Sequence, residues 1–295
     1  SVLTEIHAPF LKDHQINVWL KRDDLLHPII SGNKWRKLKY NLDAALALGK
    51  DTLISMGGAY SNHLHALAYV GKCLGLKTIG LIRGERPNPL TPTLQDMASW
   101  GMTLRFIPRS EYRLLRDYKN GQDLPGIKDN EYWLPEGGAN YLALKGIAEI
   151  INEIAIKYDT VCVSCGTGAT LAGLIDAIPK HVSALGFAAL KAHENKSKFL
   201  NDDVKSFLNE SLNKECHNWD IFYDYHFGGF AKIDSVLTAF IADFKEKTTI
   251  QLEPVYTGKM LYGIYDLIAS GYFKPGQCII ALHTGGLQGN RGYSE

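Results

Sequence analysis

The chain has 295 residues, 45% of them hydrophobic and 28 of them glycine, as in a globular protein of one or two closely associated domains with an ample core. Its 32 basic and 31 acidic residues nearly cancel, so charge gives no support for binding to nucleic acid or to an anionic membrane. No apolar run approaches the length of a membrane span, and residues 1–5 lack the charged and apolar regions of a signal peptide. We therefore expect a cytoplasmic protein without a membrane partner.

Apolar, strand-like runs alternate with amphipathic, helix-like runs along the chain. In chain order the pattern predicts a strand at 17–21, a helix at 36–42, a strand at 52–56, a helix at 65–71, strands at 78–82, 104–107 and 160–164, a helix at 171–175, a strand at 184–187, a helix at 260–267 and a strand at 278–282. Residues 120–128 are rich in Gly and Pro and predict a loop, while the polar region 196–218 predicts a surface helix with loops. The alternation predicts an α/β protein with mostly parallel sheets covered by helices on both faces.

A single lysine, Lys34, stands at the mouth of the glycine turn Ser31-Gly32-Asn33-Lys34, just before a predicted helix. A lysine in such a place could form a Schiff base with an aldehyde cofactor. The alternative is an ordinary basic helix face, because clustered Lys and Arg residues usually lie on a solvated surface. Other segments of the sequence are needed to choose between a Schiff-base lysine and a surface lysine.

Two loops that follow predicted strands present polar groups at the start of a helix. Residues 57–63 offer glycines, the Ser61 hydroxyl and the Asn62 amide, although both side chains are also of the types that cap helices. Residues 164–170 combine glycines with the hydroxyls of Thr167 and Thr170, which suits a phosphate. The second loop lacks the full glycine spacing of a dinucleotide-binding loop, so it predicts an anion site without naming the cofactor.

Two further segments lie near the C-terminal end of the sequence. Residues 253–259 place Tyr256 beside Thr257 in a loop before a helix, and residues 282–287 end the last core strand with His283. A lone histidine is more often structural than catalytic, although its side chain suits proton transfer.

Five cysteines do not suggest a disulfide framework, since their number is odd. Cys162 and Cys165 have a Cys-x-x-Cys spacing, but no second ligand pair follows at a matching interval. We expect Cys162 to pack in a strand core and Cys165 to border a loop, in preference to a metal or redox role.

Six motifs in order resemble the pyridoxal-phosphate enzymes that include 1-aminocyclopropane-1-carboxylate deaminase and D-cysteine desulfhydrase, within the tryptophan-synthase-β-like group of fold type II. The resemblance runs from Trp19 to Gly286. The motifs are Lys-Arg-Asp-Asp at 21–24, Gly-Asn-Lys at 32–34, Ser-Asn-His at 61–63, the glycine-rich loop at 165–170, Pro-Val-Tyr at 254–256 and His-Thr-Gly-Gly at 283–286.

The resemblance implies pyridoxal 5'-phosphate as the cofactor, a small amino acid as the substrate, and roles for individual residues. Lys34 would hold the cofactor and move the Cα proton, and Asn62 would bond the phenolic oxygen. Ser61 would face the substrate carboxylate or assist proton transfer, and Tyr256 would lie near the pyridine ring. The implied cofactor residues are Lys34, Asn62, Cys165, Gly166, Thr167, Gly168, Ala169, Thr170, Tyr256, Thr257, Thr284 and Gly285; those on the substrate side are Asn33, Ser61, His63 and Phe230; no metal is implied.

The resemblance also implies an architecture. Two open, twisted, mostly parallel sheets flanked by helices would hold the cofactor in the cleft between a large domain, residues 1–38 with 135–295, and a small domain, residues 39–134. A homodimer is usual in this family.

Two departures bear on the reaction. Similar deaminases have a glutamate directly after the tyrosine of Pro-Val-Tyr, where this chain has Thr257, as D-cysteine desulfhydrase-like members do. A hydroxyl supplies no charge to hold a pyridinium, and an unprotonated pyridine is a weaker electron sink. Phe230 stands where a tyrosine is usual, so a site hydroxyl is missing and D-cysteine itself is in question as substrate.

These features favour a lyase that performs β-elimination from a small amino acid, as D-cysteine desulfhydrase does. The alternatives are a 1-aminocyclopropane-1-carboxylate deaminase, elimination from D-serine derivatives or sulfonated cysteine analogues, and a pyridoxal-phosphate-binding protein without turnover.

Overall fold

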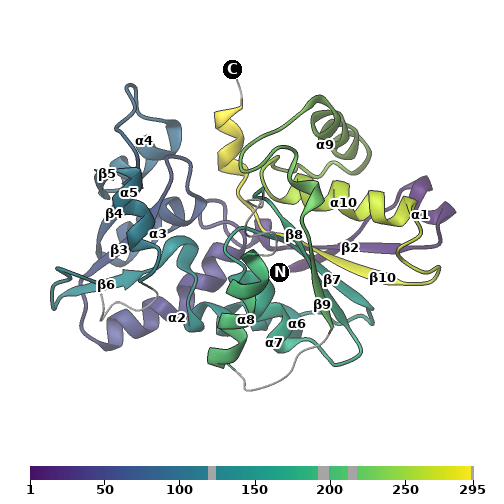
Figure 1. Ribbon diagram of the computed structural model, residues 1–295, viewed down its shortest axis with the longest axis horizontal. Helices are drawn as coiled ribbons and strands as arrows, with labels where there is room; N and C mark the ends of the chain where they lie inside the picture. The colour runs from purple at the N-terminus through teal and green to yellow at the C-terminus, as the bar shows by residue number, and fades with distance from the viewer. Residues whose placement is uncertain (119–123, 192–198, 212–217, 294–295) are drawn as a thin grey trace.

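Two separate sheets organise the protein in the computed structural model, which describes residues 1–118, 124–191, 199–211 and 218–293. Figure 1 shows the smaller sheet on the left and the larger one on the right. The expected α/β class with mostly parallel sheets is confirmed.

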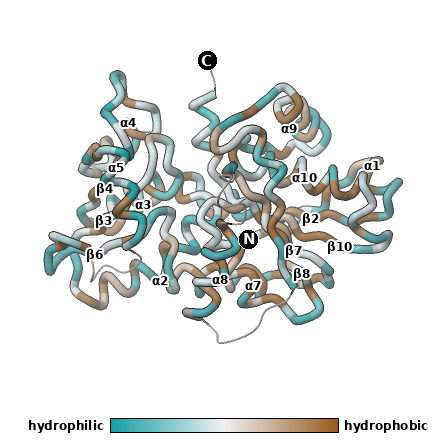
Figure 2. Tube along the Cα trace, viewed as in Figure 1, coloured by the Kyte–Doolittle hydropathy of each residue, from teal (hydrophilic) through white to brown (hydrophobic). Residues whose placement is uncertain are grey.

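The larger sheet has six strands in the order β1-β2-β10-β7-β8-β9. β1 is antiparallel to β2, and the other neighbours are parallel. The strands are β1 (Val2–Glu5), β2 (Asn17–Arg22), β7 (Thr160–Cys165), β8 (Ser183–Ala188), β9 (Trp219–Phe222) and β10 (Cys278–His283). β7 and β10 are strongly hydrophobic in Figure 2 and lie at the centre of the sheet, as expected of strands buried on both faces.

Helices cover both faces of this sheet. One core joins it to α6 (Tyr141–Asn152), α7 (Ala169–Ala177) and α8 (Phe199–Ser211). The other joins it to α1 (Pro9–Asp13), α9 (Ser235–Thr248) and α10 (Thr257–Ala269).

The smaller sheet has four parallel strands in the order β5-β4-β3-β6. They are β3 (Thr52–Gly57), β4 (Lys77–Arg83), β5 (Thr103–Ile107) and β6 (Glu131–Leu134). The helices α2 (Asn33–Ala47), α3 (Asn62–Leu74) and α4 (Pro92–Ser99) pack on one face, and α5 (Arg109–Leu115) packs on the other. Short 3-10 helices, η1 (Asp23–Leu25), η3 (Glu136–Gly138), η4 (Asp224–His226) and η5 (Leu287–Gly292), lie in the connections.

Every strand and helix predicted by periodicity is present, usually one to three residues longer at one or both ends. The short strands β1 and β9 lie at sheet edges and were not predicted, because four residues carry little periodic signal. The helices α1, α4, α5, α6 and α9 were not predicted either. Region 196–218 contains α8, which is more than a surface helix, since Leu200, Val204, Phe207 and Leu208 are buried against α7. Part of that region, and part of the predicted loop 120–128, lies outside the described residues.

The strands 52–134 form the smaller sheet, but the domain bounds 1–38 with 135–295 and 39–134 stay a prediction. α2 runs through residue 38 without a break and contacts α6 of the larger sheet.

A largely buried ion-pair network fixes α2 against the elements of the larger sheet. Arg36 donates to the Asp23 carboxylate at 2.7 Å and to Glu153, at the end of α6, at 2.7 Å. Lys21 of β2 also donates to Glu153, at 2.8 Å. Because removing one partner would leave a buried charge uncompensated, this network restricts how α2 can sit.

We expect Gly32→Ala to lower the free energy of unfolding by about 4 kcal/mol or more, at the upper end for single substitutions. Gly32 has φ +70°, and a Cβ there would lie 1.8 Å from the Thr284 carbonyl oxygen. Gly49→Ala is the matched control, since Gly49 has φ +66° with nothing within 4 Å of a Cβ. The control should cost only the left-handed backbone strain, about 1 kcal/mol. Equal losses in urea unfolding would contradict the close approach.

Candidate active site

Loops from both sheets meet where their parallel strands end, which is where such sheets bind ligands. The backbone of Gly32, just before α2, touches Thr284, which directly follows β10. Asn62, at the start of α3, contacts Gly286, and Tyr256 contacts Gly166 after β7. Segments far apart in sequence therefore surround one region between the sheets (Figure 1).

Lys34 is the second residue of α2 and is half-buried. Its Nζ donates to Asn33 Oδ1 at 2.7 Å. Burial lowers the pKa of Lys34 to about 8, although the Glu253 carboxylate opposes this shift. Lys39 pairs with Glu149 at the surface, as expected for a residue on a solvated basic face. Lys34 does not lie on such a face, because burial lowers its pKa.

Asn33 connects Lys34 to the glycine-rich loop. Its side chain is buried and donates from Nδ2 to Thr170 Oγ1 at 3.0 Å, while its Oδ1 accepts from Lys34. In this chain Asn33 therefore bridges the lysine and the loop, and its expected place beside the substrate stays a prediction.

The loop after β7 is built for close approach to a ligand. Cys165 ends the strand, Gly166 and Thr167 follow, and Gly168 has φ +78° directly before α7, which begins with Ala169 and Thr170. The amino terminus of α7 thus opens onto the loop, as at anion sites.

The cysteines of this strand are structural, as expected. Cys162 and Cys165 are buried and free of disulfides. Burial raises the pKa of the Cys165 thiol to about 12, which leaves it a poor nucleophile. The described residues contain no group of His, Cys, Asp and Glu side chains that could hold a metal ion.

A second lysine, Lys37, belongs to the site and was missed by the sequence analysis. It is buried, and its one hydrogen bond among the described residues is a long one of 3.5 Å to the Gly137 carbonyl. Burial lowers the pKa of Lys37 well below the usual value, and the nearby Lys34 ammonium adds to this effect. Its charge also acts on Cys165 at the start of the loop. The signal was present, because residues three apart share a helix face.

The three residues of segment 61–63 make different contacts. Ser61 Oγ caps α3 by accepting from Leu64 N at 3.2 Å, so the capping alternative holds for this oxygen. Asn62 Oδ1 accepts from Gln288 Nε2 at 2.6 Å. His63 is buried, its Nε2 lies 2.9 Å from Ser55 Oγ, and its Nδ1 has no partner among the described residues. Burial, with the Lys34 and Lys37 charges, lowers the pKa of His63 to about 3, so this ring is neutral.

Glu253 shapes the segment that holds Tyr256 and Thr257. Its buried carboxylate accepts the backbone N–H groups of Val255, Tyr256 and Thr257. The Tyr256 ring lies against Gly166, where a Cβ would come 3.3 Å from Cε1. The Thr257 hydroxyl is fully buried and makes no hydrogen bond of good geometry among the described residues.

The remaining expected residues border the same region. Phe230 is 45% exposed, and its ring lies 6.0 Å from that of Tyr256 at 66°. Thr284 is buried, and Gly285, at φ +72°, packs against Ser31. His283 is structural, since its buried ring bonds the Gln251 carbonyl at 2.9 Å.

The donor set fits a phosphorylated aldehyde. Lys34 offers an amine that is partly neutral near pH 8. Lys37 and the loop before α7 offer a buried cation and helix N–H groups for the phosphate. The buried hydroxyl of Thr257 offers a contact for a ring nitrogen.

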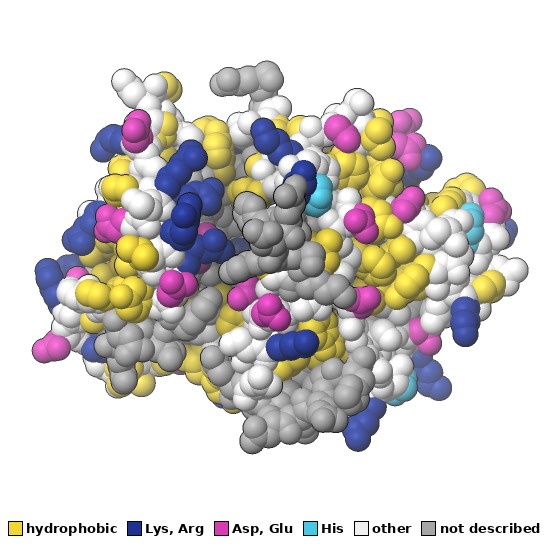
Figure 3. Space-filling view, in the orientation of Figure 1, with side chains coloured by type: hydrophobic (Ala, Val, Ile, Leu, Met, Phe, Trp, Pro, Cys, Tyr) yellow, Lys and Arg dark blue, Asp and Glu magenta, His cyan; other side chains and the backbone are white. Residues whose placement is uncertain are grey.

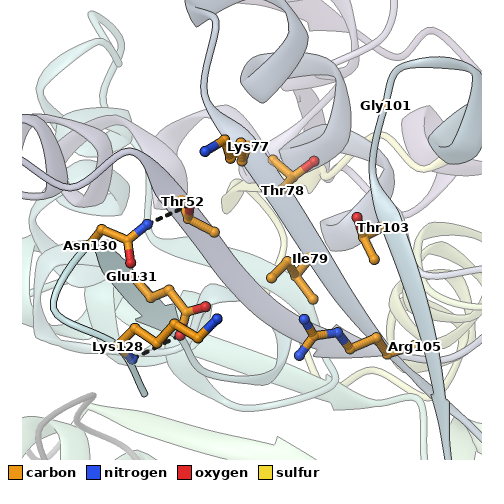
Figure 4. Close-up of a pocket in the computed structure, with 10 residues that line it drawn as sticks. All are labelled: Thr52, Lys77, Thr78, Ile79, Gly101, Thr103, Arg105, Lys128, Asn130 and Glu131. Carbon is orange, nitrogen blue, oxygen red and sulfur yellow. Dashed lines mark hydrogen bonds between the residues drawn. The ribbon is translucent and has the colours of Figure 1, made fainter. Parts of the chain in front are cut away.

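A surface pocket of about 270 Å³ lies elsewhere, at the opposite edge of the smaller sheet (Figure 4). Its walls come from the amino ends of the strands, including Thr52, Lys77 and Glu131. None of the expected site residues lines it. On the face seen in Figure 3, Lys and Arg side chains gather on the side of the smaller sheet, among interspersed acidic ones.

We expect Lys34 to react with a small amine-modifying reagent with a midpoint near pH 8. Its neutral fraction at that pH is about one half, against well under 1% for a free lysine side chain. The exposed Lys77 serves as the reference residue. Reductive methylation followed by peptide mass spectrometry across pH 6 to 11 measures both residues in one sample. A Lys34 midpoint near 10 would contradict the desolvated environment.

The chain is similar to known proteins over most of its length. The chain is 30% identical over 300 residues to the "Bifunctional D-cysteine desulfhydrase/1-aminocyclopropane-1-carboxylate deaminase, mitochondrial" of Arabidopsis thaliana, covering 92% of this chain and 73% of the relative. It is 28% identical to a "D-cysteine desulfhydrase" of Salmonella schwarzengrund, covering 95% and 90%. The crystal structure of an "ACC deaminase homologue" superposes with a TM-score of 0.83 at 29% identity, covering 99% and 91%.

No helix in the described part of the chain has the length and apolar character needed to cross a membrane. The family described as "Pyridoxal-phosphate dependent enzyme" matches residues 4–285. The expected family and cofactor are thereby confirmed, and the chain belongs to the pyridoxal-phosphate-dependent enzymes of fold type II.

Proposed function

We propose that this enzyme is a lyase that performs β-elimination from a small amino acid with a good leaving group, as D-cysteine desulfhydrase does. With D-cysteine and one water, the products would be pyruvate, ammonia and sulfide. The observation that carries the proposal is Thr257, an uncharged and fully buried side chain at the expected place of the pyridine nitrogen. Without a charged partner the pyridine stays unprotonated, which disfavours a long-lived carbanion and favours departure of a β thiol.

Bound pyridoxal phosphate would make the Cα proton of an attached amino acid acidic. Lys34 is the residue proposed to attach the cofactor and then to move that proton. Its pKa, lowered to about 8 by burial, supports this role, because a useful fraction of the amine is neutral near physiological pH. The bond from Lys34 to Asn33 restrains the amine beside the loop.

The phosphate would be held by the loop from Cys165 to Thr170, with Gly166, Thr167, Gly168 and Ala169 between them, and by Lys37. A buried ammonium whose described bonds include no carboxylate supports this role for Lys37, since a phosphate would supply the missing negative charge. Asn62 would donate to the phenolic oxygen, and Thr284 and Gly285 would border the ring.

The substrate would contact Ser61, Tyr256 and Phe230. Because Ser61 Oγ already accepts from Leu64 N, its own hydrogen is available to a substrate carboxylate. Phe230 contacts Tyr256 and brings no hydroxyl, which supports a substrate other than D-cysteine among the open choices. Asn33 and His63 would act from behind this layer, His63 as a neutral ring.

A 1-aminocyclopropane-1-carboxylate deaminase is the second candidate, supported by the names of the Arabidopsis relative and of the superposed structure. Elimination from D-serine derivatives or sulfonated cysteine analogues uses the same chemistry. A cofactor-binding protein without turnover is the candidate from another class, and the presence of both Lys34 and Ser61 argues against it.

We also propose a cytoplasmic homodimer. The free thiols of Cys73, Cys162, Cys165 and Cys278 support a reducing compartment, and the family resemblance supports the dimer.

A panel of D- and L-amino acids, assayed for 2-oxo acid release, tests the activity. We expect turnover of at least one amino acid with a β leaving group, and loss of turnover by about 1,000-fold or more in Lys34→Ala, as on removal of a covalent catalyst. Lys39→Ala is the control, because Lys39 is a surface residue on the same helix. Bound cofactor without release of any 2-oxo acid would favour the binding protein instead.

Thr257→Glu tests the reason for preferring elimination. A carboxylate there should protonate the pyridine nitrogen and shift the product ratio toward ring opening of 1-aminocyclopropane-1-carboxylate. Thr257→Gln matches the size without the charge and should not shift that ratio. An unchanged product profile in Thr257→Glu, with the cofactor still bound, would show that the argument from Thr257 is wrong.

A further inference from the structure

We propose that Gln288 is a positioning residue that fixes the orientation of the Asn62 amide and so aims an N–H donor at the cofactor. This inference rests on the proposed function in one respect, the role of Asn62 as a ligand of the phenolic oxygen. Gln288 was not among the residues expected from the sequence.

Gln288 connects the two sheets. It belongs to η5, which follows β10 of the larger sheet, and it touches residues of α3 and α4 on the smaller one. Figure 1 shows this C-terminal segment between the two halves of the molecule. Asn62 therefore receives its partner from the other sheet.

The orientation of the Gln288 amide is determined by Arg291, which can only donate to it. Its Oε1 accepts from the buried Thr93 hydroxyl at 2.6 Å and from Arg291 Nη2 at 3.2 Å. A guanidinium has no acceptor, so the atom that faces Arg291 must be the oxygen. Arg291 is itself held by Asp96, which also pairs with His65 at 2.9 Å.

The orientation of Asn62 follows from that of Gln288. With Oε1 engaged, Gln288 presents Nε2, which donates to Asn62 Oδ1 at 2.6 Å. Asn62 Nδ2 then lies on the other side, over Gly286, where a Cβ would come within 2.6 Å of it. Nδ2 has no acceptor among the described residues, and a phenolic oxygen of the cofactor is the acceptor it lacks.

Isosteric substitution distinguishes orientation from space filling. In Gln288→Glu, one carboxylate oxygen still accepts from Thr93 and Arg291, but the other can only accept from Asn62. The Asn62 amide would rotate to donate to it and would turn Oδ1 toward the phenolic oxygen. Gln288→Met fills similar space with no hydrogen bond, which leaves Asn62 free to take either orientation.

We expect Gln288→Glu to weaken pyridoxal 5'-phosphate binding by about tenfold or more and to shift the absorption maximum of the bound cofactor, since a hydrogen bond to a charged oxygen is replaced by repulsion. Gln288→Met should weaken binding less, by roughly threefold. Gln95→Glu, the same change at an exposed position of α4, should leave both readouts unchanged. The full-length chain is titrated with pyridoxal 5'-phosphate, and thermal unfolding without cofactor is measured for each variant.

The relative affinities of Gln288→Glu and Gln288→Met for the cofactor test the proposal. A space-filling role predicts that Gln288→Glu, which keeps the contact with Arg291, binds better than Gln288→Met, and that result would overturn the proposal. If Asn62→Ala binds the cofactor with unchanged affinity and spectrum, the premise about Asn62 fails. If wild type binds the cofactor but Lys34→Ala keeps the same spectrum, the proposed function itself fails.

Discussion

The close approach of two backbones is the constraint on which the site depends. Gly32 lies so near the Thr284 carbonyl that no side chain fits between them, and a Cβ on Gly285 would come 2.4 Å from Ser31 Oγ. The turn before α2 is thereby held against the end of β10. Since Lys34 stands two residues after this contact, backbone packing holds the backbone from which its side chain starts, and the hydrogen bond to Asn33 restrains its amine.

Burial of several basic side chains in one small region sets the chemistry. Lys34, Lys37 and His63 influence one another, and each has a pKa lowered by desolvation. Glu253 is the carboxylate that acts on Lys34, but its own oxygens are occupied by backbone N–H groups. The region therefore favours an anionic ligand and keeps its histidine neutral, because a low-dielectric interior disfavours each uncompensated charge.

Hydrogen bonds connect residues beside one sheet to residues beside the other, so the geometry of the site depends on both sheets. Asn33 reaches Thr170 beside the larger sheet, and Gln288 reaches Asn62 and Thr93 beside the smaller one. A change in how the sheets sit would alter several of these contacts at once. The ion-pair network of Arg36, Asp23 and Glu153 opposes such a change at the first turn of α2.

Periodicity was sufficient to find most of the parallel strands and the helices α2, α3, α7 and α10, because buried strands and amphipathic helices are local patterns. The glycine turns and polar helix starts likewise marked Lys34, Ser61, Asn62 and the loop at 165–170, since their chemistry lies in adjacent residues. Lys37, Glu253 and Gln288 were not identified as site residues. Each looks ordinary in the sequence, and its importance comes from partners that lie far away along the chain. Only tertiary packing decides whether a lysine is buried without a carboxylate or which way an amide must turn, because both depend on groups contributed by the other sheet.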